Sequence, residues 1–371
     1  MYNNKLKFNV TDFAVTERRN KMSFHTFELK YKIRDVTRSM EIFESLSKPG
    51  GKFYKDKKEY ADTWVCEKLR DNGIIIKIRN IKKNGYMHEM LYYKINPRRV
   101  MNDNDYIGLF ESSEAKDMLN RIDELIESKF NMALPSVESM KLNRIDFCTN
   151  VLLNGQEEVK AYIEILKRGL TLKKYSLQKY DNPIAKRKTL SKNGLTYIGE
   201  NGVNITYYNK FREMSEQNLP MRDVEQLNKI LRIEIQCKNK KVKRLYKKYM
   251  IKDVNEFLYL SNKIGREIFE KYSNLFCGAG DFYRLDAVKR SIEKSSFKTN
   301  TKKLMTELAE YSAKHSSLDK AVSEMSERYG DDKTQKVLKK FDELGISPVI
   351  IPRRSVIKYA GNPLKLALKA Y

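Results

Sequence analysis

The sequence is poor in the residues that build most metal centres and all disulfide frameworks. Its 371 residues include only four cysteines and three histidines. The cysteines are Cys66, Cys148, Cys237 and Cys277, and no two of them have the CxxC spacing of a zinc or redox site. We therefore expect reduced, buried thiols and no zinc-hydrolase chemistry.

Long apolar runs are also missing. No stretch approaches the roughly 18 consecutive apolar residues of a membrane-spanning helix. The first residues, MYNNKLKFNVTDF, lack the apolar run of a signal peptide. We expect a cytoplasmic protein with no membrane partner.

Acidic side chains are the minority among many charges. Lys and Arg total 73 against 48 Asp and Glu, which gives a net charge of +25. The abundance of Lys, Asn, Ile and Tyr indicates that an AT-rich coding genome contributes to this excess. A field of this size still attracts polyanions, and we expect a nucleic acid as the partner.

The pattern of apolar residues predicts an α+β fold: antiparallel sheets with packed helices in two units, followed by a helical C-terminal region. A strand is expected over 23–33, and Asn84-Gly85 predicts a hairpin turn. A helix over 111–130 begins the second unit, which continues with strands over 142–152, 203–210 and 230–237. We expect units at 1–110, 111–250 and 251–371.

Three strands of the second unit have one apolar and one polar face, because side chains alternate along a strand. The polar faces carry Arg144 and Asp146, then Asn204, Thr206, Tyr208 and Lys210, then Arg232, Glu234 and Gln236. If these strands share a sheet, this face would suit the binding of phosphate groups and chemistry on them. An ordinary solvated face with cross-strand ion pairs explains the same alternation.

The order of these segments resembles the signature strands of trans-acting rolling-circle replication initiators of Gram-positive plasmids and mobile elements. The resemblance covers residues 140 to 285. The matching residues are Arg144 and Asp146 (R-x-D), Tyr197 and Gly199 (Y-x-G), Tyr208, Lys210 and Glu213 (R-x-Y-x-K-x-x-E), and Arg232 and Glu234 (R-x-E).

Two positions depart from the family pattern. Thr206 stands where the family usually has arginine, and Asn150 stands where a second aspartate often follows R-x-D. Two hypotheses follow. The protein is a rolling-circle initiator that nicks and rejoins one strand at an origin, or it is a non-catalytic DNA-binding protein of a phage or mobile element on the same scaffold. An RNA-binding protein is a third class, although no RNP-type aromatic motif is evident.

The resemblance implies that Tyr208 attacks a DNA phosphate, giving a 5′-phosphotyrosine and a free 3′-hydroxyl. A tyrosine with an ordinary pKa of about 10 needs activation for this step. Tyr207 is the alternative nucleophile, but alternation places it on the apolar face with Ile205. Both tyrosines could instead be packing residues.

The resemblance also implies a divalent cation and several basic contacts. Asp146, Glu234 and Glu213 would hold Mg²⁺ or Mn²⁺, which prefer oxygen ligands. Lys210 would lie beside the phosphate or the phenolate. Arg144 and Arg232 would either clamp backbone phosphates or orient the carboxylates.

Basic segments outside the strands are candidate DNA contacts. The loop residues are Lys186, Arg187, Lys188 and Lys192, and the residues after the last strand are Lys238, Lys240, Lys241, Lys243 and Arg244. Both segments could equally be solvated surface. A helix-turn-helix around His315 is a candidate for reading the origin. We expect DNA as partner, single-stranded or cruciform at the origin, with a homodimer and a host helicase as further candidates.

Overall fold

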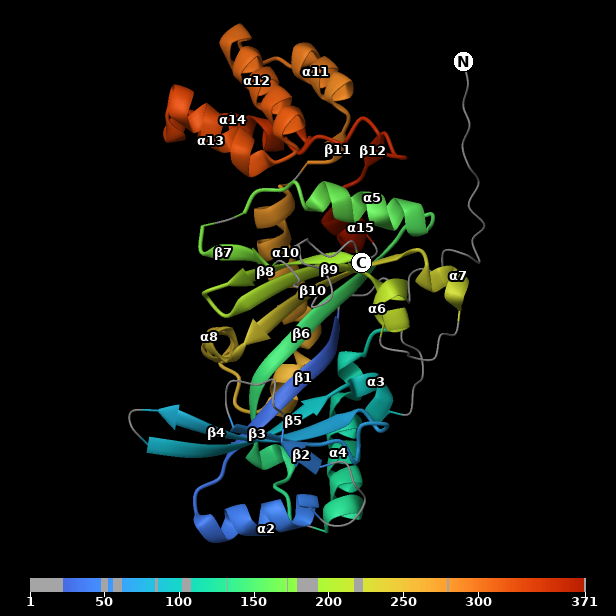
Figure 1. Ribbon diagram of the computed structural model, residues 1–371, viewed down its shortest axis with the longest axis vertical. Coiled ribbons are helices and arrows are strands. Elements are labelled where there is room, and N and C mark those ends of the chain that lie inside the picture. The colour runs from blue at the N-terminus through green and yellow to red at the C-terminus, as the bar shows by residue number, and fades with distance from the viewer. Residues whose placement is uncertain are drawn as a thin grey trace.

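The structure is a computed structural model. It describes residues 23–47, 53–55, 62–83, 86–101, 108–131, 133–171, 173–178, 193–216, 223–278 and 280–369. Figure 1 shows an elongated molecule, with a group of helices at one end, a large sheet in the middle and a second group of strands and helices at the other end.

The N-terminal half contains the first five strands. Its elements are β1 (Ser23–Lys32), α2 (Val36–Ser47), β2 (Phe53–Lys55), β3 (Asp62–Cys66), β4 (Ile74–Lys83), β5 (Tyr86–Ile95), α3 (Pro97–Val100), the 3-10 turn η1 (Ser112–Glu114) and α4 (Ala115–Phe130). The predicted hairpin is present as the antiparallel pair β4–β5, while Asn84 and Gly85 lie outside the described residues.

The middle of the chain adds five more strands. Its elements are η2 (Val137–Ser139), β6 (Lys141–Leu152), α5 (Gln156–Leu166), β7 (Tyr175–Gln178), β8 (Gly194–Gly199), β9 (Val203–Asn209), α6 (Lys210–Glu216), α7 (Val224–Leu227), β10 (Ile230–Lys238) and α8 (Asn239–Tyr249).

The C-terminal region is helical, with one small two-stranded sheet among the described residues. Its elements are α9 (Val254–Tyr259), α10 (Ser261–Cys277), β11 (Phe282–Tyr283), α11 (Leu285–Lys294), α12 (Thr299–His315), α13 (Leu318–Tyr329), α14 (Asp331–Leu344), β12 (Tyr359–Ala360) and α15 (Pro363–Lys369). None of the helices described here has the length and apolar character needed to span a membrane.

The strands of both halves form one antiparallel sheet. Its order is β2-β3-β4-β5-β1-β6-β10-β9-β8-β7. β1 joins the two halves, because it pairs with β5 on one side and with β6 on the other. The predicted α+β fold is confirmed, with the two sets of strands continuous through β1. The expected boundaries at residues 110 and 250 remain predictions.

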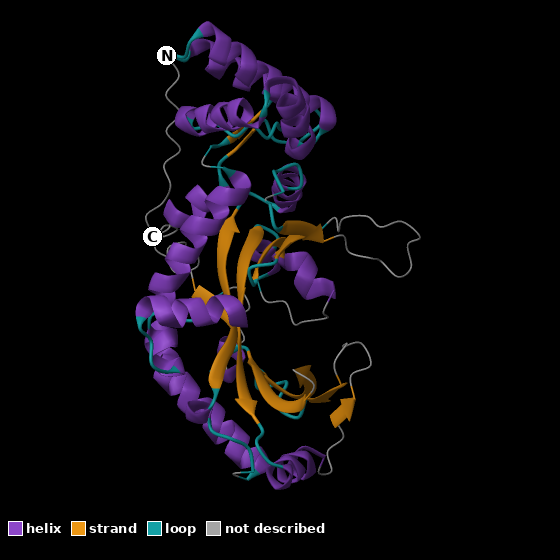
Figure 2. Cartoon of the chain, turned by 90° about the vertical axis from the view of Figure 1, so that its left-hand side faces the viewer, coloured by secondary structure: helices purple, strands orange, loops and turns teal. Residues whose placement is uncertain are grey.

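The two faces of the sheet differ in what covers them. Phe147, Tyr207 and Ile235 belong to the main core and are at most 1% exposed. On this apolar face, α10 packs so closely that a Cβ at Gly265 would lie 3.0 Å from the Phe147 ring. Figure 2 shows helices along one side of the strands for most of their length.

The opposite face is polar over β6, β10 and β9, and α6 and α7 lie against one part of it. Met214 of α6, Leu227 of α7 and Ile230 of β10 form a small apolar cluster of their own. Ile230 has the same strand parity as Arg232 and Glu234, so this cluster lies on the polar face. It fixes α6 beside the polar side chains of the three strands.

Candidate functional site

The polar side chains of β6, β10 and β9 form two adjacent rows across the sheet. Arg232 lies opposite Asn150 on one side and Tyr208 on the other. Two residues further along β10, Glu234 lies opposite Cys148 and Thr206. Thr206 in turn exchanges a hydrogen bond with the Thr196 hydroxyl of β8, at 3.1 Å. The register therefore brings the candidate nucleophile, a carboxylate and a cation onto one surface.

Tyr208 and Glu234 are hydrogen-bonded to each other. The phenolic hydroxyl of Tyr208 donates to Glu234 Oε1. The neighbouring Tyr207 is 1% exposed and belongs to the main core. Of the two candidate nucleophiles, Tyr208 is the one on the polar face beside the charged groups.

The surroundings of Tyr208 favour the protonated form of its hydroxyl. Burial, and next the charge of Glu234, raise the pKa of Tyr208 well above its ordinary value of 10.0. Burial also raises the pKa of Glu234, opposed by the hydrogen bond from Tyr208 and by the charge of Arg232. The phenol is thus neutral at rest, and Glu234 is the acceptor in contact with its proton.

Two buried cations flank this pair. Arg232 is 2% exposed, and its Nε donates to Asn150 Oδ1 at 2.8 Å. Lys210, the first residue of α6, is 4% exposed, and its Nζ lies 2.7 Å from Glu213 Oε2. Burial, followed by the charge of Arg232, lowers the pKa of Lys210.

Asp146 lies on the β6 side of the site. Its Oδ2 accepts a hydrogen bond from Arg144 at 2.9 Å, and its Oδ1 is buried without a hydrogen-bond partner. Burial raises the pKa of Asp146, with the charge of Arg144 as the largest opposing influence. A buried carboxylate oxygen without a donor is a position where a water molecule or an ion is expected.

The predicted metal ligands only partly share a surface. Within the described ranges, no three His, Cys, Asp or Glu side chains form a group that could hold a metal ion. Asp146 and Glu234 lie on the same face of adjacent strands, and the unpaired Oδ1 of Asp146 fits a hard cation that prefers oxygen. Glu213 lies on α6, where its carboxylate pairs with Lys210.

His25 is a site residue that the sequence did not reveal. The pairing of β1 with β6 shifts register between Phe24 and Thr26, so His25 lies at a β-bulge, a feature that re-aims a side chain. Its Nε2 lies 3.3 Å from Glu234 Oε1. Burial, and next the charge of Arg232, lower the pKa of His25 to about 3, so the ring is neutral. Only knowledge that β1 neighbours β6 would have identified it.

The Y-x-G residues have structural contacts. Tyr197 is 2% exposed and donates from its hydroxyl to the carbonyl of Leu166 at 3.3 Å. A Cβ at Gly199 would lie 2.5 Å from the carbonyl oxygen of Val203. These two residues therefore shape the β8–β9 hairpin and its packing on α5.

The candidate DNA contacts divide into two groups. Lys186, Arg187, Lys188 and Lys192 lie outside the described residues. Lys238 precedes α8, and Lys240, Lys243 and Arg244 on this helix are exposed. Lys241 is half-buried, with its Nζ 5.5 Å from the centre of the Tyr272 ring. The apolar side of α8, Val242 and Leu245, is buried in the main core, so its basic side faces outward.

The candidate helix-turn-helix consists of α12 and α13. Ser316 has a left-handed backbone conformation and Ser317 caps α13 with its side chain. His315 is half-buried and pairs with Glu324 of α13, so this side chain joins the two helices. That this helix pair recognises the DNA sequence of an origin remains a prediction.

The Phage_CRI family model, which describes the N-terminal part of a replication-associated protein, matches residues 29–258, well over half of the chain. The chain belongs to this family. The predicted membership of a rolling-circle replication initiator family is thereby confirmed. Because replication initiators act on DNA, DNA is the partner of this chain. The matched residues include every member of the polar rows on β6, β9 and β10, while α10 to α15 lie outside the match.

Comparison with solved structures gives a more remote similarity. The structure of a rolling circle replication initiator protein from Geobacillus stearothermophilus is 10% identical, with a TM-score of 0.30, over 61% of this chain and 77% of that chain. A similarity this remote does not assign a role to any residue of this chain. No curated protein matches the sequence.

Proposed function

We propose that this replication protein nicks and rejoins one strand of origin DNA through a covalent bond between Tyr208 and a 5′-phosphate. The observation that carries the proposal is the hydrogen bond from the Tyr208 hydroxyl to Glu234, on a face that also holds Arg232 and Lys210. A nucleophile in contact with a base is the arrangement that covalent catalysis requires.

The first step exchanges one ester for another. Tyr208 Oη forms a bond to phosphorus, the phenolic proton passes to Glu234, and the bond from phosphorus to the 3′ oxygen breaks. The 3′ oxygen leaves with the bonding electrons and takes a proton from water. Because an ester is kept throughout, the reverse reaction closes the strand without an energy source.

The buried cations offset charge as it develops. Lys210 is held by Glu213 at 2.7 Å and is proposed to contact a phosphate oxygen. Arg232 is buried and, unlike Lys210, does not line the cavity beside the site, so we assign it the positioning role that the sequence left open. Its charge lowers the pKa of Tyr208, against the larger effect of burial.

A divalent cation completes the proposal. Asp146 and Glu234 would hold Mg²⁺ or Mn²⁺, which when bound would neutralise negative charge on the phosphate. Arg144, which donates to Asp146 at 2.9 Å, would orient that carboxylate. Glu213 lies on α6 and not on the face of β6 and β10 that holds Asp146 and Glu234, so we assign it to Lys210, with which it pairs at 2.7 Å.

The test is a covalent adduct on a denaturing gel. The wild-type protein is incubated with single-stranded and supercoiled DNA that carry the origin of its own element, with Mn²⁺ or Mg²⁺. We expect an adduct that is absent in Tyr208→Phe. The matched control is Tyr207→Phe, which removes the same hydroxyl one residue away on the core side and should retain the adduct.

Two results would overturn the proposal. An adduct that survives Tyr208→Phe but disappears in Tyr207→Phe would move the nucleophile. No adduct under any condition, with tight and salt-sensitive binding to the same DNA, would favour a non-catalytic DNA-binding protein. A non-catalytic protein would also explain why the neutral residues Thr206 and Asn150 stand where the family pattern has an arginine and an aspartate.

A further inference from the structure

A cavity of about 400 Å³ opens beside the candidate site, on the N-terminal side of the sheet. His25 and Lys210 line it from the site, and Lys94 of β5 and Arg99 of α3 line it from the other half of the sheet. Figure 1 shows α3 and α6 on the same side of the molecule, where the two halves of the sheet meet. The cavity therefore continues the polar surface across β1.

The charge of the lining is strongly positive. It includes four basic side chains, Arg70, Lys94, Arg99 and Lys210, and one carboxylate, Glu213, which is already paired with Lys210. Arg70 is paired at 2.8 Å with Glu67, which lies outside the lining, so Lys94 and Arg99 carry the remaining positive charge. An anionic group is the chemical class that would balance this lining.

Two polar atoms of the lining, Lys94 Nζ and His25 Nδ1, have no direct partner among the described residues. Lys94 is half-buried, and its ammonium group makes no hydrogen bond or ion pair with any described residue. His25 Nδ1 is buried and has no hydrogen-bond partner. Glu28, its cross-strand neighbour on β1, and Asp146 act on this lysine only through their charge. A half-buried lysine that faces a cavity without a direct ion pair leaves its ammonium group open to an anionic ligand.

The wall that carries Arg99 is built by a close backbone approach. Gly73 has a φ of +83°, and a Cβ there would lie 2.6 Å from Arg99 Cβ and 2.7 Å from the Asn96 carbonyl. The Asn96 amide also donates to the Gly73 carbonyl at 2.8 Å. Only glycine fits this turn, which holds the start of α3 against the start of β4 and fixes Arg99 at the cavity.

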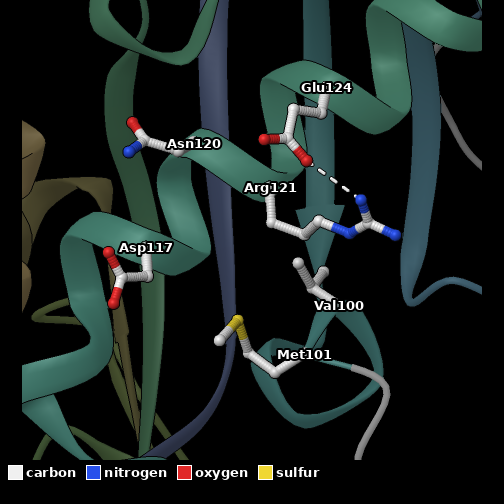
Figure 3. A pocket seen from close by; sticks show the side chains of 6 residues that line it. All are labelled: Val100, Met101, Asp117, Asn120, Arg121 and Glu124. Carbon is white, nitrogen blue, oxygen red and sulfur yellow. Dashed lines mark hydrogen bonds and ion pairs between the residues drawn. The ribbon is translucent and has the colours of Figure 1, made fainter.

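A second cleft, which includes Val100 of α3 in its lining, has the opposite character. It measures about 310 Å³ and is lined by Asp117 and Glu124 of α4, with Arg121 held to Glu124 at 2.9 Å (Figure 3). Its carboxylates would repel a phosphate. The basic lining thus distinguishes the cavity beside His25 and Lys210 from this second cleft.

We propose that this cavity binds the phosphate of a nucleotide that neighbours the cleaved one in single-stranded DNA, with Lys94 and Arg99 as its contacts. The inference rests on the proposed function, since it names a second phosphate contact for the DNA strand that Tyr208 is proposed to cleave. It makes the N-terminal half of the sheet part of the DNA-binding surface. The same chemistry would accept a free nucleotide, which the experiment separates.

The experiment measures binding of a fluorescent oligothymidylate to the full chain over a range of salt concentrations. Lys94→Gln should lower affinity by about tenfold and reduce the slope of log affinity against log salt by about 0.7, the value for one lost phosphate contact on a single strand. Lys94→Arg should restore most of both. Lys32→Gln, at the exposed far end of β1, is the control that removes one charge outside the cavity.

The outcomes separate this inference from the nicking proposal. Equal affinities and slopes for Lys94→Gln and Lys32→Gln would overturn the cavity assignment, whether or not an adduct forms. A Lys94-dependent slope without any adduct would keep the cavity and remove the nicking proposal. Lys94-dependent binding of thymidine 5′-monophosphate, with unchanged DNA binding, would assign the cavity to a free nucleotide and overturn the inference. If Lys94→Gln fails to fold, Arg99→Gln is measured in its place.

Discussion

Arg232 donates a hydrogen bond from Nε to Oδ1 of Asn150, at 2.8 Å, in the buried floor of the candidate site. Asn150 is also the position where an aspartate would match the family pattern. A neutral amide satisfies the guanidinium hydrogen bond without cancelling its charge. The charge of Arg232 therefore lowers the pKa of Tyr208, which lies directly across the strand pair, against the larger effects of burial and of Glu234.

Replacing Asn150 by leucine should destabilise the protein. The change leaves a buried charged donor without this acceptor, which costs about 1–3 kcal/mol of unfolding free energy. Urea denaturation measures the loss. Asn150→Asp keeps an acceptor and should stay close to the wild type, and equal stability of all three proteins would show that the hydrogen bond contributes nothing.

Glu234→Gln should slow strand cleavage with little effect on DNA binding. The amide can still accept the Tyr208 hydrogen bond but cannot take the proton, and loss of a positioned base lowers rates by roughly 10²–10⁴-fold. Single-turnover cleavage of labelled origin DNA measures the rate. Glu225→Gln, on the exposed surface of α7, is the control. A wild-type rate in Glu234→Gln would exclude this residue as the proton acceptor.

Asp146→Asn should weaken metal binding. Deletion of one carboxylate from a site with few oxygen donors lowers affinity for Mn²⁺, which can be followed by electron paramagnetic resonance of the free ion without any DNA. Removal of the metal with EDTA should abolish the covalent adduct while salt-sensitive DNA binding persists. Unchanged Mn²⁺ affinity in Asp146→Asn would remove this residue from the ligand set.

Substitutions on the basic side of α8 should weaken DNA binding uniformly across sequences. Lys240→Gln and Lys243→Gln should each lower the salt slope by about 0.7–0.9 if each contacts one phosphate. Lys129→Gln on α4 removes an exposed charge elsewhere and should leave the slope unchanged. If the α8 variants behave like this control, the helix is ordinary solvated surface.

Local patterns predicted much of the sheet, because strand parity depends only on neighbouring residues. β9 alternates buried and partly exposed residues from Val203 to Asn209, and this separates Tyr207 from Tyr208 as the sequence indicated. The same parity puts Cys148 on the polar face between Asp146 and Asn150, where burial raises the pKa of its thiol to about 12.

The contribution of the N-terminal half could not be predicted in this way. His25 reaches Glu234 only because β1 pairs with β6, and Lys94 reaches the same surface only because β5 pairs with β1. Strand neighbours that are distant in sequence depend on the packing of the whole sheet, which no local periodicity encodes. The turn at Gly73 depends in the same way on its contact with α3.

The strand order has a consequence for how the chain folds as it leaves the ribosome. β10 lies between β6 and β9, and Arg232 and Asn150 are separated by 82 positions, while Asn143 and its hydrogen-bond partner Glu28 are separated by 115. β6 can pair with β1 as soon as both strands have been made, but its other edge stays unpaired until β10, which ends at residue 238, has emerged from the ribosome. Such long-range pairing is slow and exposes a strand edge to aggregation. A nascent chain that stalls before β10 therefore has no assembled site, and the rate of translation through residues 150–238 should influence the yield of soluble protein.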